Sequence, residues 1–268
     1  MMSMMRRAVR GLAFVALCGT GLLAAGCTAP PSPVAQAPVP AAGGIVLLGE
    51  THDNPAHHQW QLAQIEALYA REPRLAIGLE MVPQNRQAAL DAWTAGTLDE
   101  AQFLAAVDWR TAWGFDYALY RPVFDFARAH HIPMIGLNVE REVVRAVGRG
   151  GWSALSAWTD LDLGRPVAPQ PAYNRYLLAA FAGHGRMGDA GALNRGFAGF
   201  TDVQLLWDRA MAVRIAQARA AGAPLVAVLV GSGHVRDGWG IPAQLRDLGY
   251  ASTFLVAPGA DGATDSGE

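Results

Sequence analysis

Carboxylates and imidazoles follow the ends of several apolar segments of this sequence. Glu50 and His52 come just after the run 45–48, Glu80 follows a second run, and His234 follows a third. Such side chains can transfer protons as general acids and bases. They can also bind a divalent metal ion. A set of this kind therefore marks a candidate site for either chemistry.

The apolar runs before these side chains are typical of buried β-strands. They cover residues 45–49, 75–79, 133–138, 224–230 and 250–256. Helical segments lie between the runs, which predicts an α/β fold, specifically a three-layer sandwich with a largely parallel five-stranded sheet. Because the carboxyl ends of parallel strands meet at one edge, we expect the four ionisable side chains above to share a pocket with Asn138.

Two segments are too long to be ordinary connections. Residues 84–115 carry five large aromatic side chains and are predicted to form a helical cap, and residues 140–200 form a second, Gly- and Pro-rich insertion. Together they predict a small helical subdomain inserted beside the sheet. Pro122 predicts the start of a helix over 122–130. Further helices are expected over 54–71, 202–220 and 241–248.

The two ends of the chain are predicted to lie outside the folded domain, which spans 44–257. Residues 1–26 contain arginines followed by a short apolar run, and they end in small residues before Cys27. This start resembles a bacterial lipoprotein signal peptide, which implies cleavage before Cys27 and lipid on its sulfur. The alternative is an ordinary secretory signal with an incidental cysteine. Residues 27–43 are Pro- and Ala-rich and predict an extended tether, while 258–268 predict a disordered tail.

The amino-acid composition and the charge of the sequence limit the kinds of molecule that the protein is expected to bind. Half of the 268 residues are apolar, and the formal net charge is −2. All positive side chains are Arg, because the sequence contains no Lys. No basic cluster points to nucleic acid. The lipoprotein start predicts a bacterial cell-envelope location, and Thr28 and Ala29 after the cysteine favour the outer membrane because the Asp of an inner-membrane retention signal is missing.

Two strand ends carry the motifs Gly49-Glu50-Thr51-His52 and Gly231-Ser232-Gly233-His234. Other notable stretches are Tyr120-Arg121-Pro122, the segments 133–138 and 204–212, and Gly238-Trp239-Gly240-Ile241-Pro242. In this order and spacing, these motifs resemble a known family, the ChaN-like haem-binding lipoproteins. That family belongs to a superfamily with the Tiki proteases, the TraB proteins and the erythromycin esterases. The resemblance covers roughly 44–257 and implies a homodimer that encloses two stacked haems.

The resemblance also implies a set of haem-binding residues. In the family, one Tyr of each monomer binds iron, while His and Lys of the partner hold the propionates. By this resemblance Tyr120 is the iron-binding tyrosine, and we expect its hydroxyl to face the gap between the two insertions. Tyr173 is the second candidate, and His184 is the candidate for a propionate. The Lys has no counterpart in this sequence, and an Arg is the expected replacement.

Two functions stay open on this basis. The first is a non-enzymatic, membrane-anchored haem-binding lipoprotein that serves haem or iron uptake. The second is a metal-dependent hydrolase of the protease or esterase type, in which the strand-end cluster of Glu50, His52, Glu80 and His234 holds a divalent ion such as zinc. The sequence lacks a local helical metal motif such as His-Glu-x-x-His, so no single residue is singled out as catalytic.

Overall fold

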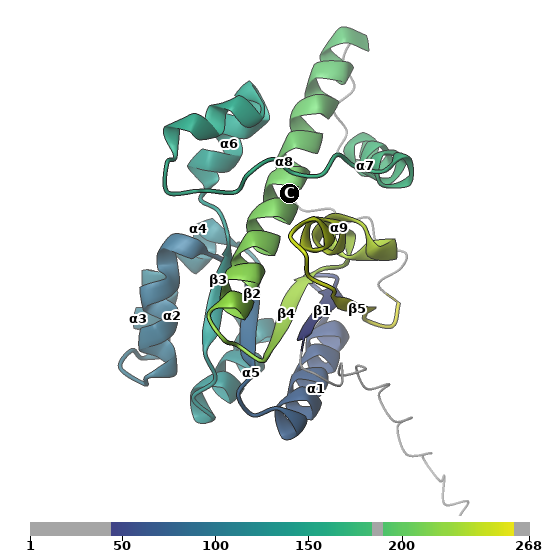
Figure 1. Ribbon diagram of the computed structural model, residues 1–268. Coiled ribbons are helices and arrows are strands. Elements are labelled where there is room, and N and C mark those ends of the chain that lie inside the picture. Colours follow the sequence, from purple (N-terminus) through teal and green to yellow (C-terminus); the bar gives the residue numbers. More distant parts are fainter. Residues whose placement is uncertain (1–43, 184–189, 260–268) are drawn as a thin grey trace, which may run out of the picture. The chain divides into compact units, whose positions relative to one another are not determined.

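The structure is a computed structural model that describes residues 44–183 and 190–259. These residues form a central sheet with helices on both sides (Figure 1). The predicted signal peptide, the predicted lipidation site Cys27 and the predicted tether lie outside the described residues, as do His184 and nearly all of the predicted tail. Among the described residues, no helix has the length and apolar composition needed to cross a membrane.

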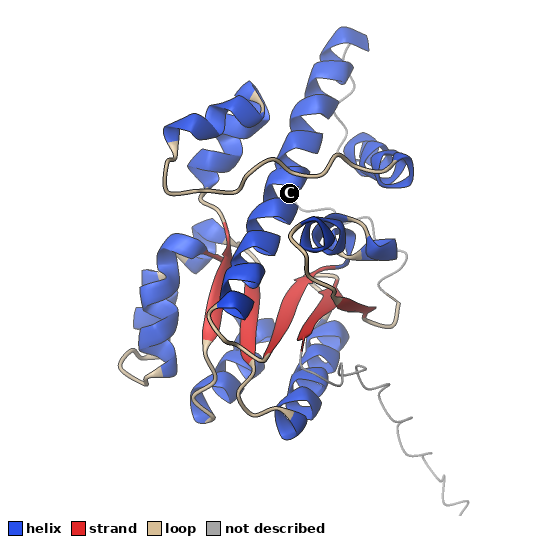
Figure 2. Cartoon of the chain, in the orientation of Figure 1, coloured by secondary structure: helices blue, strands red, loops and turns tan. Residues whose placement is uncertain are grey.

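All five strands run parallel, and they lie in the order β3-β2-β4-β1-β5 (Figure 2). The predicted α/β sandwich with a largely parallel five-stranded sheet is therefore confirmed. Each strand ends within a few residues of the predicted position. The strands are β1 (Gly44–Glu50), β2 (Ala76–Pro83), β3 (Met134–Asn138), β4 (Leu225–Gly231) and β5 (Thr253–Val256).

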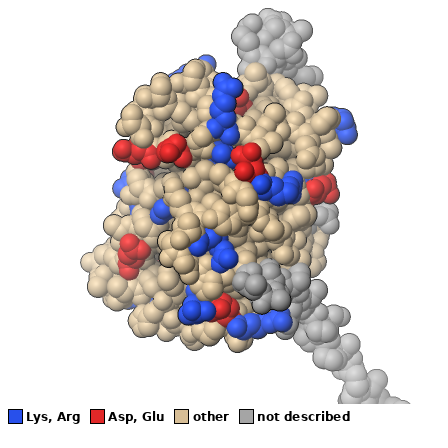
Figure 3. Space-filling view, in the orientation of Figure 1, with Lys and Arg blue, Asp and Glu red and all other residues tan. Residues whose placement is uncertain are grey.

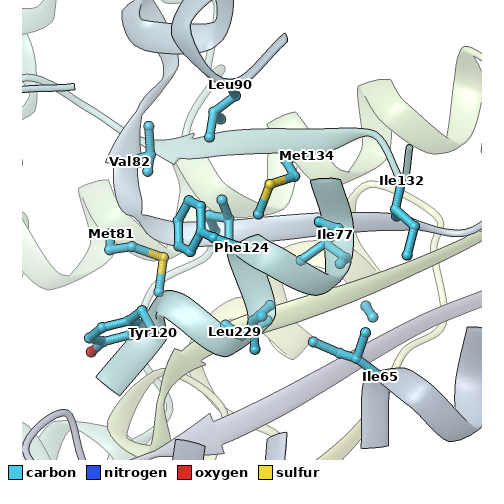
Figure 4. Close-up of a cluster of buried hydrophobic side chains, with 14 of the residues drawn as sticks. Ile65, Ile77, Met81, Val82, Leu90, Tyr120, Phe124, Ile132, Met134 and Leu229 are labelled. Carbon is cyan, nitrogen blue, oxygen red and sulfur yellow. The ribbon is translucent and has the colours of Figure 1, made fainter. Parts of the chain in front are cut away.

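One face of the sheet packs against α1 (Pro55–Arg71) and α5 (Tyr117–Ala129). Successive strand side chains point to opposite faces, so alternate residues of each strand enter this layer. Burying each large apolar side chain contributes roughly 1.5–3 kcal/mol before the entropy of ordering is counted. Side chains of this cluster (Figure 4) include Ile65, Ile77, Tyr120, Phe124 and Leu229.

The other face packs against α8 (Ala190–Ala220) and α9 (Gly240–Asp247). Both faces of the strands are thus covered, which explains why their sequences show continuous apolar runs without polar alternation. Helix α8 is longer than the predicted helix and extends past the sheet between α6 and α7 (Figure 1). The cluster on this side includes Leu47, Met211, Ile215, Val228 and Leu245.

The two insertions are helical, as expected. The first contains η1 (Gln84–Arg86), α2 (Gln87–Thr94), α3 (Glu100–Ala106) and α4 (Trp109–Ala112). The second contains α6 (Arg141–Gly150), η2 (Trp152–Ala157) and α7 (Pro171–Gly183). Short turns η3 (Ser232–His234) and η4 (Arg236–Gly238) follow β4. On the face shown in Figure 3, charged side chains are scattered among uncharged ones.

Pro122 lies inside α5 rather than at its start, so the predicted start of this helix is wrong. The helix begins earlier because Asp116 caps it, with the Asp116 side chain accepting a hydrogen bond from Ala118 N at 2.9 Å. An interior proline loses one helical hydrogen bond and costs about 3 kcal/mol. Burial of Tyr117 and Phe124 on the same helix offsets this cost.

Candidate functional site

A cavity of about 620 Å³ lies at the carboxyl edge of the sheet. Its floor contains His52, Glu80, Asn138 and His234. Glu80 lies within β2 near its carboxyl end, Asn138 ends β3, and His52 and His234 follow β1 and β4. The structure therefore brings together four of the five residues that were predicted to converge there. Glu50 does not line the cavity and lies buried behind it, with 1% of its surface exposed.

The walls of the cavity are aromatic and apolar. Trp113 and Phe115 come from the first insertion, Leu177 comes from α7, and Trp207 comes from α8. The volume is within the range of small-molecule and cofactor sites, which combine apolar walls with a few polar groups. Three arginines from α4 and α6 line the solvent-exposed side: Arg110, Arg141 and Arg145.

Glu50 is the centre of a first buried polar network. Its Oε1 accepts a hydrogen bond from the Tyr120 hydroxyl at 3.0 Å and another from His52 Nδ1 at 2.9 Å. Its Oε2 lies 2.8 Å from His58 Nδ1. Burial alone would raise the pKa of Glu50, but hydrogen bonds with His52 and His58 outweigh it and hold the pKa below its usual value. The network thus keeps a carboxylate ionised beneath the cavity.

His52 connects this network to the cavity. A carboxylate accepts hydrogen bonds only, so Nδ1 of His52 carries the proton that Glu50 accepts. The ring packs edge-on against Trp113 with 4.5 Å between centroids and lies 5.0 Å from Phe115. Its orientation is therefore set from both sides, by a carboxylate behind and by aromatic walls in front.

Asp208 is the centre of a second network. The Asp208 carboxylate accepts from the Tyr173 hydroxyl at 2.8 Å and from His234 Nδ1 at 2.7 Å, and His234 Nε2 lies 3.3 Å from Glu80. Burial alone would lower the pKa of His234, but the charge of Asp208 and hydrogen bonds to Asp208 and Glu80 raise it to about 10. His234 is therefore an imidazolium held between two carboxylates.

Gly231, the last residue of β4, lies next to His52 of the first network and Glu80 of the second. Its backbone N–H donates to Glu80 Oε2 at 2.5 Å. A Cβ atom here would lie 2.9 Å from Cε1 of His52, so any side chain would displace that ring. The glycine of this motif is needed for the close approach of His52 to the backbone.

Tyr120 and Tyr173 do not line the cavity. Tyr120 is fully buried and its hydroxyl donates to Glu50, so the expectation that this hydroxyl faces the gap between the insertions is wrong. The physical reason is that a buried carboxylate needs hydrogen-bond donors. Burial and the charge of Glu50 raise the pKa of Tyr120, and burial and the charge of Asp208 raise that of Tyr173, so both stay neutral phenols.

Tyr176 is the tyrosine that the structure places in the cavity wall, and sequence reasoning missed it. It lies one turn after Tyr173 on α7, and the two rings stack at 6.3 Å with 17° between their planes. The guanidinium carbon of Arg236 lies 5.4 Å from the Tyr176 ring centroid. The spacing Tyr-x-x-Tyr was the available signal, since residues three apart share one side of a helix.

Asp208 and His58 were also missed as members of the site. Asp208 lies in the middle of an apolar helical stretch, where a charged residue is seldom buried without a partner, and this was the available signal. His58 lies in the first turn of α1, where a packed histidine is common. For Asp208 and for His58, the neighbouring sequence does not indicate which imidazole or carboxylate the side chain contacts.

The metal-binding alternative gains no support from the geometry. Within 44–183 and 190–259, no group of three or more His, Cys, Asp or Glu side chains is arranged to hold a metal ion. The reason is that these side chains pair with one another. Both nitrogens of His234 face carboxylates, and both oxygens of Glu50 face hydrogen-bond donors or imidazole nitrogens.

Comparison with known proteins gives a family and a fold. Residues 40–245 match the family model described as haem-binding uptake, Tiki superfamily, ChaN. No match was found among curated proteins. The structure titled cofacial heme binding to ChaN of Campylobacter jejuni has a TM-score of 0.62 and 19% identity over 80% of each chain, which shows a shared fold. A mutant of the erythromycin esterase EreC in its open conformation has a TM-score of 0.47 and 12% identity, over 81% of this chain and 70% of that one.

Proposed function

This chain belongs to the haem-binding uptake family ChaN of the Tiki superfamily, and on this basis we propose that it binds haem in the cavity at the sheet edge. Haem is a flat apolar ring that carries two carboxylates. The aromatic side chains of Trp113, Phe115 and Trp207 suit the faces of such a ring, and the cavity volume suits a ligand of this size. The residues present therefore fit the group.

The observation that carries the proposal is the position of Tyr176. It is half-buried in the wall of an aromatic cavity and comes from the second insertion. Tyrosinate is a known axial ligand of haem iron. Tyr120 and Tyr173 serve the site differently, because their hydroxyls hold the carboxylates of Glu50 and Asp208. We assign the iron ligand to Tyr176 for this reason.

Visible spectroscopy of the purified protein tests this assignment. Bound haem supplies an iron centre whose absorption spectrum reports its axial ligand. Wild type should show a shifted Soret band and a high-spin ferric spectrum with a phenolate charge-transfer band. Tyr176→Phe should lose that band and bind more weakly, while the apolar walls retain part of the affinity. Tyr69→Phe is the matched control, because Tyr69 on α1 lies outside the cavity lining.

Two results would contradict the proposal in different ways. If haem addition leaves the wild-type spectrum equal to that of free haem, the haem-binding function fails. If Tyr176→Phe keeps the phenolate band and Tyr120→Phe or Tyr173→Phe loses it, haem binds but the iron ligand is another tyrosine. The first outcome contradicts haem binding itself, whereas the second contradicts only the assignment of Tyr176 as the iron ligand.

We further propose that the protein is a lipoprotein of the bacterial outer membrane that takes part in haem uptake. The support is the small-residue sequence before Cys27 and the proline-rich segment after it. Cys27→Ser should abolish incorporation of a radiolabelled fatty acid and leave the protein unprocessed. Membrane fractionation then tests the location. Retained label in the variant contradicts the anchoring proposal.

A homodimer is part of the same proposal. Leu178 on α7 is 51% exposed and lies beside Leu177 and Ala180, which line the cavity. An exposed large apolar side chain next to a ligand site suits a contact with a second copy. Sedimentation equilibrium with and without haem tests this. Leu178→Glu should lower the dimer fraction, whereas a wild-type protein that is monomeric under both conditions contradicts it.

A further inference from the structure

We infer that the loop 232–239 after β4 orients Tyr176 for its role as the iron ligand, with Gly233 as the positioning residue on which this orientation depends. Three residues of the loop lie against the side chain of Tyr176: Gly233, Arg236 and Trp239. These three residues are called the tyrosine cradle below. The inference rests on the proposed haem-binding function, because it concerns the side chain that is proposed to bind the haem iron.

Gly233 leaves room for the hydroxyl group of Tyr176. A Cβ atom at this position would lie 3.0 Å from the hydroxyl oxygen, so any side chain would displace that oxygen by a few tenths of an ångström. Gly233 does not have a positive φ, so its backbone conformation alone does not require glycine. The requirement comes from Tyr176. Both residues line the cavity, so the displaced oxygen is one that a ligand meets.

The other two members of the tyrosine cradle restrict the ring of Tyr176. The guanidinium carbon of Arg236 lies 5.4 Å from the ring centroid. The Trp239 ring lies 6.0 Å away, directly before α9, which lies beside α7 (Figure 1). Tyr173 stacks on the same ring from within α7. A ligand side chain whose rotamer is held by its neighbours keeps its donor atom in one direction.

The buried network around Asp208 fixes the tyrosine cradle relative to α7. His234, directly after Gly233, donates to the Asp208 carboxylate at 2.7 Å. The Tyr173 hydroxyl, one turn before Tyr176 on α7, donates to the same carboxylate at 2.8 Å. One buried carboxylate therefore holds both the loop that carries the cradle and the helix that carries the iron ligand. This gives the second network a role in the site although Asp208 does not line the cavity.

A metal bond depends on the position of its donor atom more strongly than apolar packing does. Changes to residues that orient a metal ligand typically lower metal affinity by about 10- to 100-fold. Haem and metal-free protoporphyrin IX share the porphyrin ring and both carboxylates, but only haem offers iron to the Tyr176 oxygen. A displaced hydroxyl should therefore weaken the binding of haem and leave that of protoporphyrin IX unchanged.

The test measures the affinity of the full chain for both ligands by quenching of tryptophan fluorescence, and the visible spectrum of the haem complex. The cradle variant is Gly233→Ala. The matched control is Gly183→Ala on α7, where an added Cβ atom meets no atom within 4 Å. Tyr176→Phe gives the reference for complete loss of the iron ligand. Urea unfolding of each ligand-free variant checks that it is folded.

A second pair of variants tests the cradle without adding an atom at the cavity. Arg236→Gln removes the cation beside the Tyr176 ring, and Arg236→Lys keeps a cation there. Arg236→Gln should weaken haem binding and shift the phenolate charge-transfer band, while Arg236→Lys should restore part of both. Neither change should alter the affinity for protoporphyrin IX.

We expect wild type and Gly183→Ala to bind haem at least about tenfold more tightly than protoporphyrin IX. Gly233→Ala should lose most of this margin and shift the phenolate charge-transfer band toward the spectrum of Tyr176→Phe. Its affinity for protoporphyrin IX should stay within about twofold of wild type, since the apolar contacts remain.

Three results would overturn the inference. Gly233→Ala and Arg236→Gln that keep the wild-type margin and band would show that the cradle does not orient the ligand. Equal weakening of both ligands by Gly233→Ala would show that the added atom only fills the cavity. In both cases haem binding itself stands. If wild type binds neither ligand, the haem-binding function fails and the cradle fails with it.

Discussion

The buried imidazolium of His234 predicts that the protein loses stability as the pH rises above neutral. The pKa of His234 is about 10 in the folded protein and about 6.5 in an unfolded chain. The folded state therefore keeps a proton that the unfolded state releases between these values. The stabilisation is complete below pH 6.5 and disappears as the pH approaches 10.

The size of the effect follows from the difference between the two pKa values. For His234 alone, that difference corresponds to about 5 kcal/mol of stability below pH 6.5, at about 1.4 kcal/mol per pH unit across the window. Burial raises the pKa of Asp208, which lowers the total stability near neutral pH but does not change the slope between pH 7 and 9. His234 is only 8% exposed, so solvent screening reduces its contribution little. About 4 kcal/mol of the His234 contribution should be present at pH 7 and about 1 kcal/mol at pH 9.

Urea unfolding followed by tryptophan fluorescence at pH 7, 8 and 9 measures this contribution. His234→Gln should lower the free energy of unfolding by about 3–5 kcal/mol at pH 7, because Asp208 and Glu80 lose their cationic partner. The variant should also lose most of the pH slope that wild type shows. His130→Gln, at an exposed position, is the control and should keep the wild-type slope.

Two results would refute this reasoning. If the free energy of wild-type unfolding is flat between pH 7 and 9, His234 does not hold the additional proton. If His234→Gln shows the same slope as wild type, another group is responsible. Tyrosine ionisation does not interfere, because unfolded tyrosine has a pKa of about 10, above the pH range of the measurement.

Two further predictions concern the first network. Tyr120→Phe removes a hydrogen-bond donor from the buried carboxylate of Glu50 and should lower the free energy of unfolding by about 1.5–3 kcal/mol in urea, while the spectrum of bound haem keeps its phenolate band. Gly231→Ala places a Cβ atom 2.9 Å from Cε1 of His52 and should cost about 1–3 kcal/mol, whereas Gly183→Ala, with no atom within 4 Å, should change stability little. Unchanged urea midpoints for Tyr120→Phe and Gly231→Ala would show that these contacts do not form.

The sequence by itself determined the layers of this protein and the edge at which its polar residues gather. Its apolar runs are local features, and a strand buried on both faces must be apolar throughout. The strand-end positions of His52, Glu80 and His234 then placed them in one cavity, because parallel strands share their carboxyl edge. No contact between distant segments had to be known for this step.

Only the tertiary structure decided which side chains reach the cavity and which hold the residues behind it. Tyr120 and Glu50 are 70 positions apart, and Gly231 and Glu80 are 151 apart, so no local pattern predicts either contact. Whether a tyrosine faces a buried carboxylate or an open wall depends on how each helical insertion docks on the sheet. That docking is set by the packing of the whole core, which assigns Tyr176 rather than Tyr120 to the cavity.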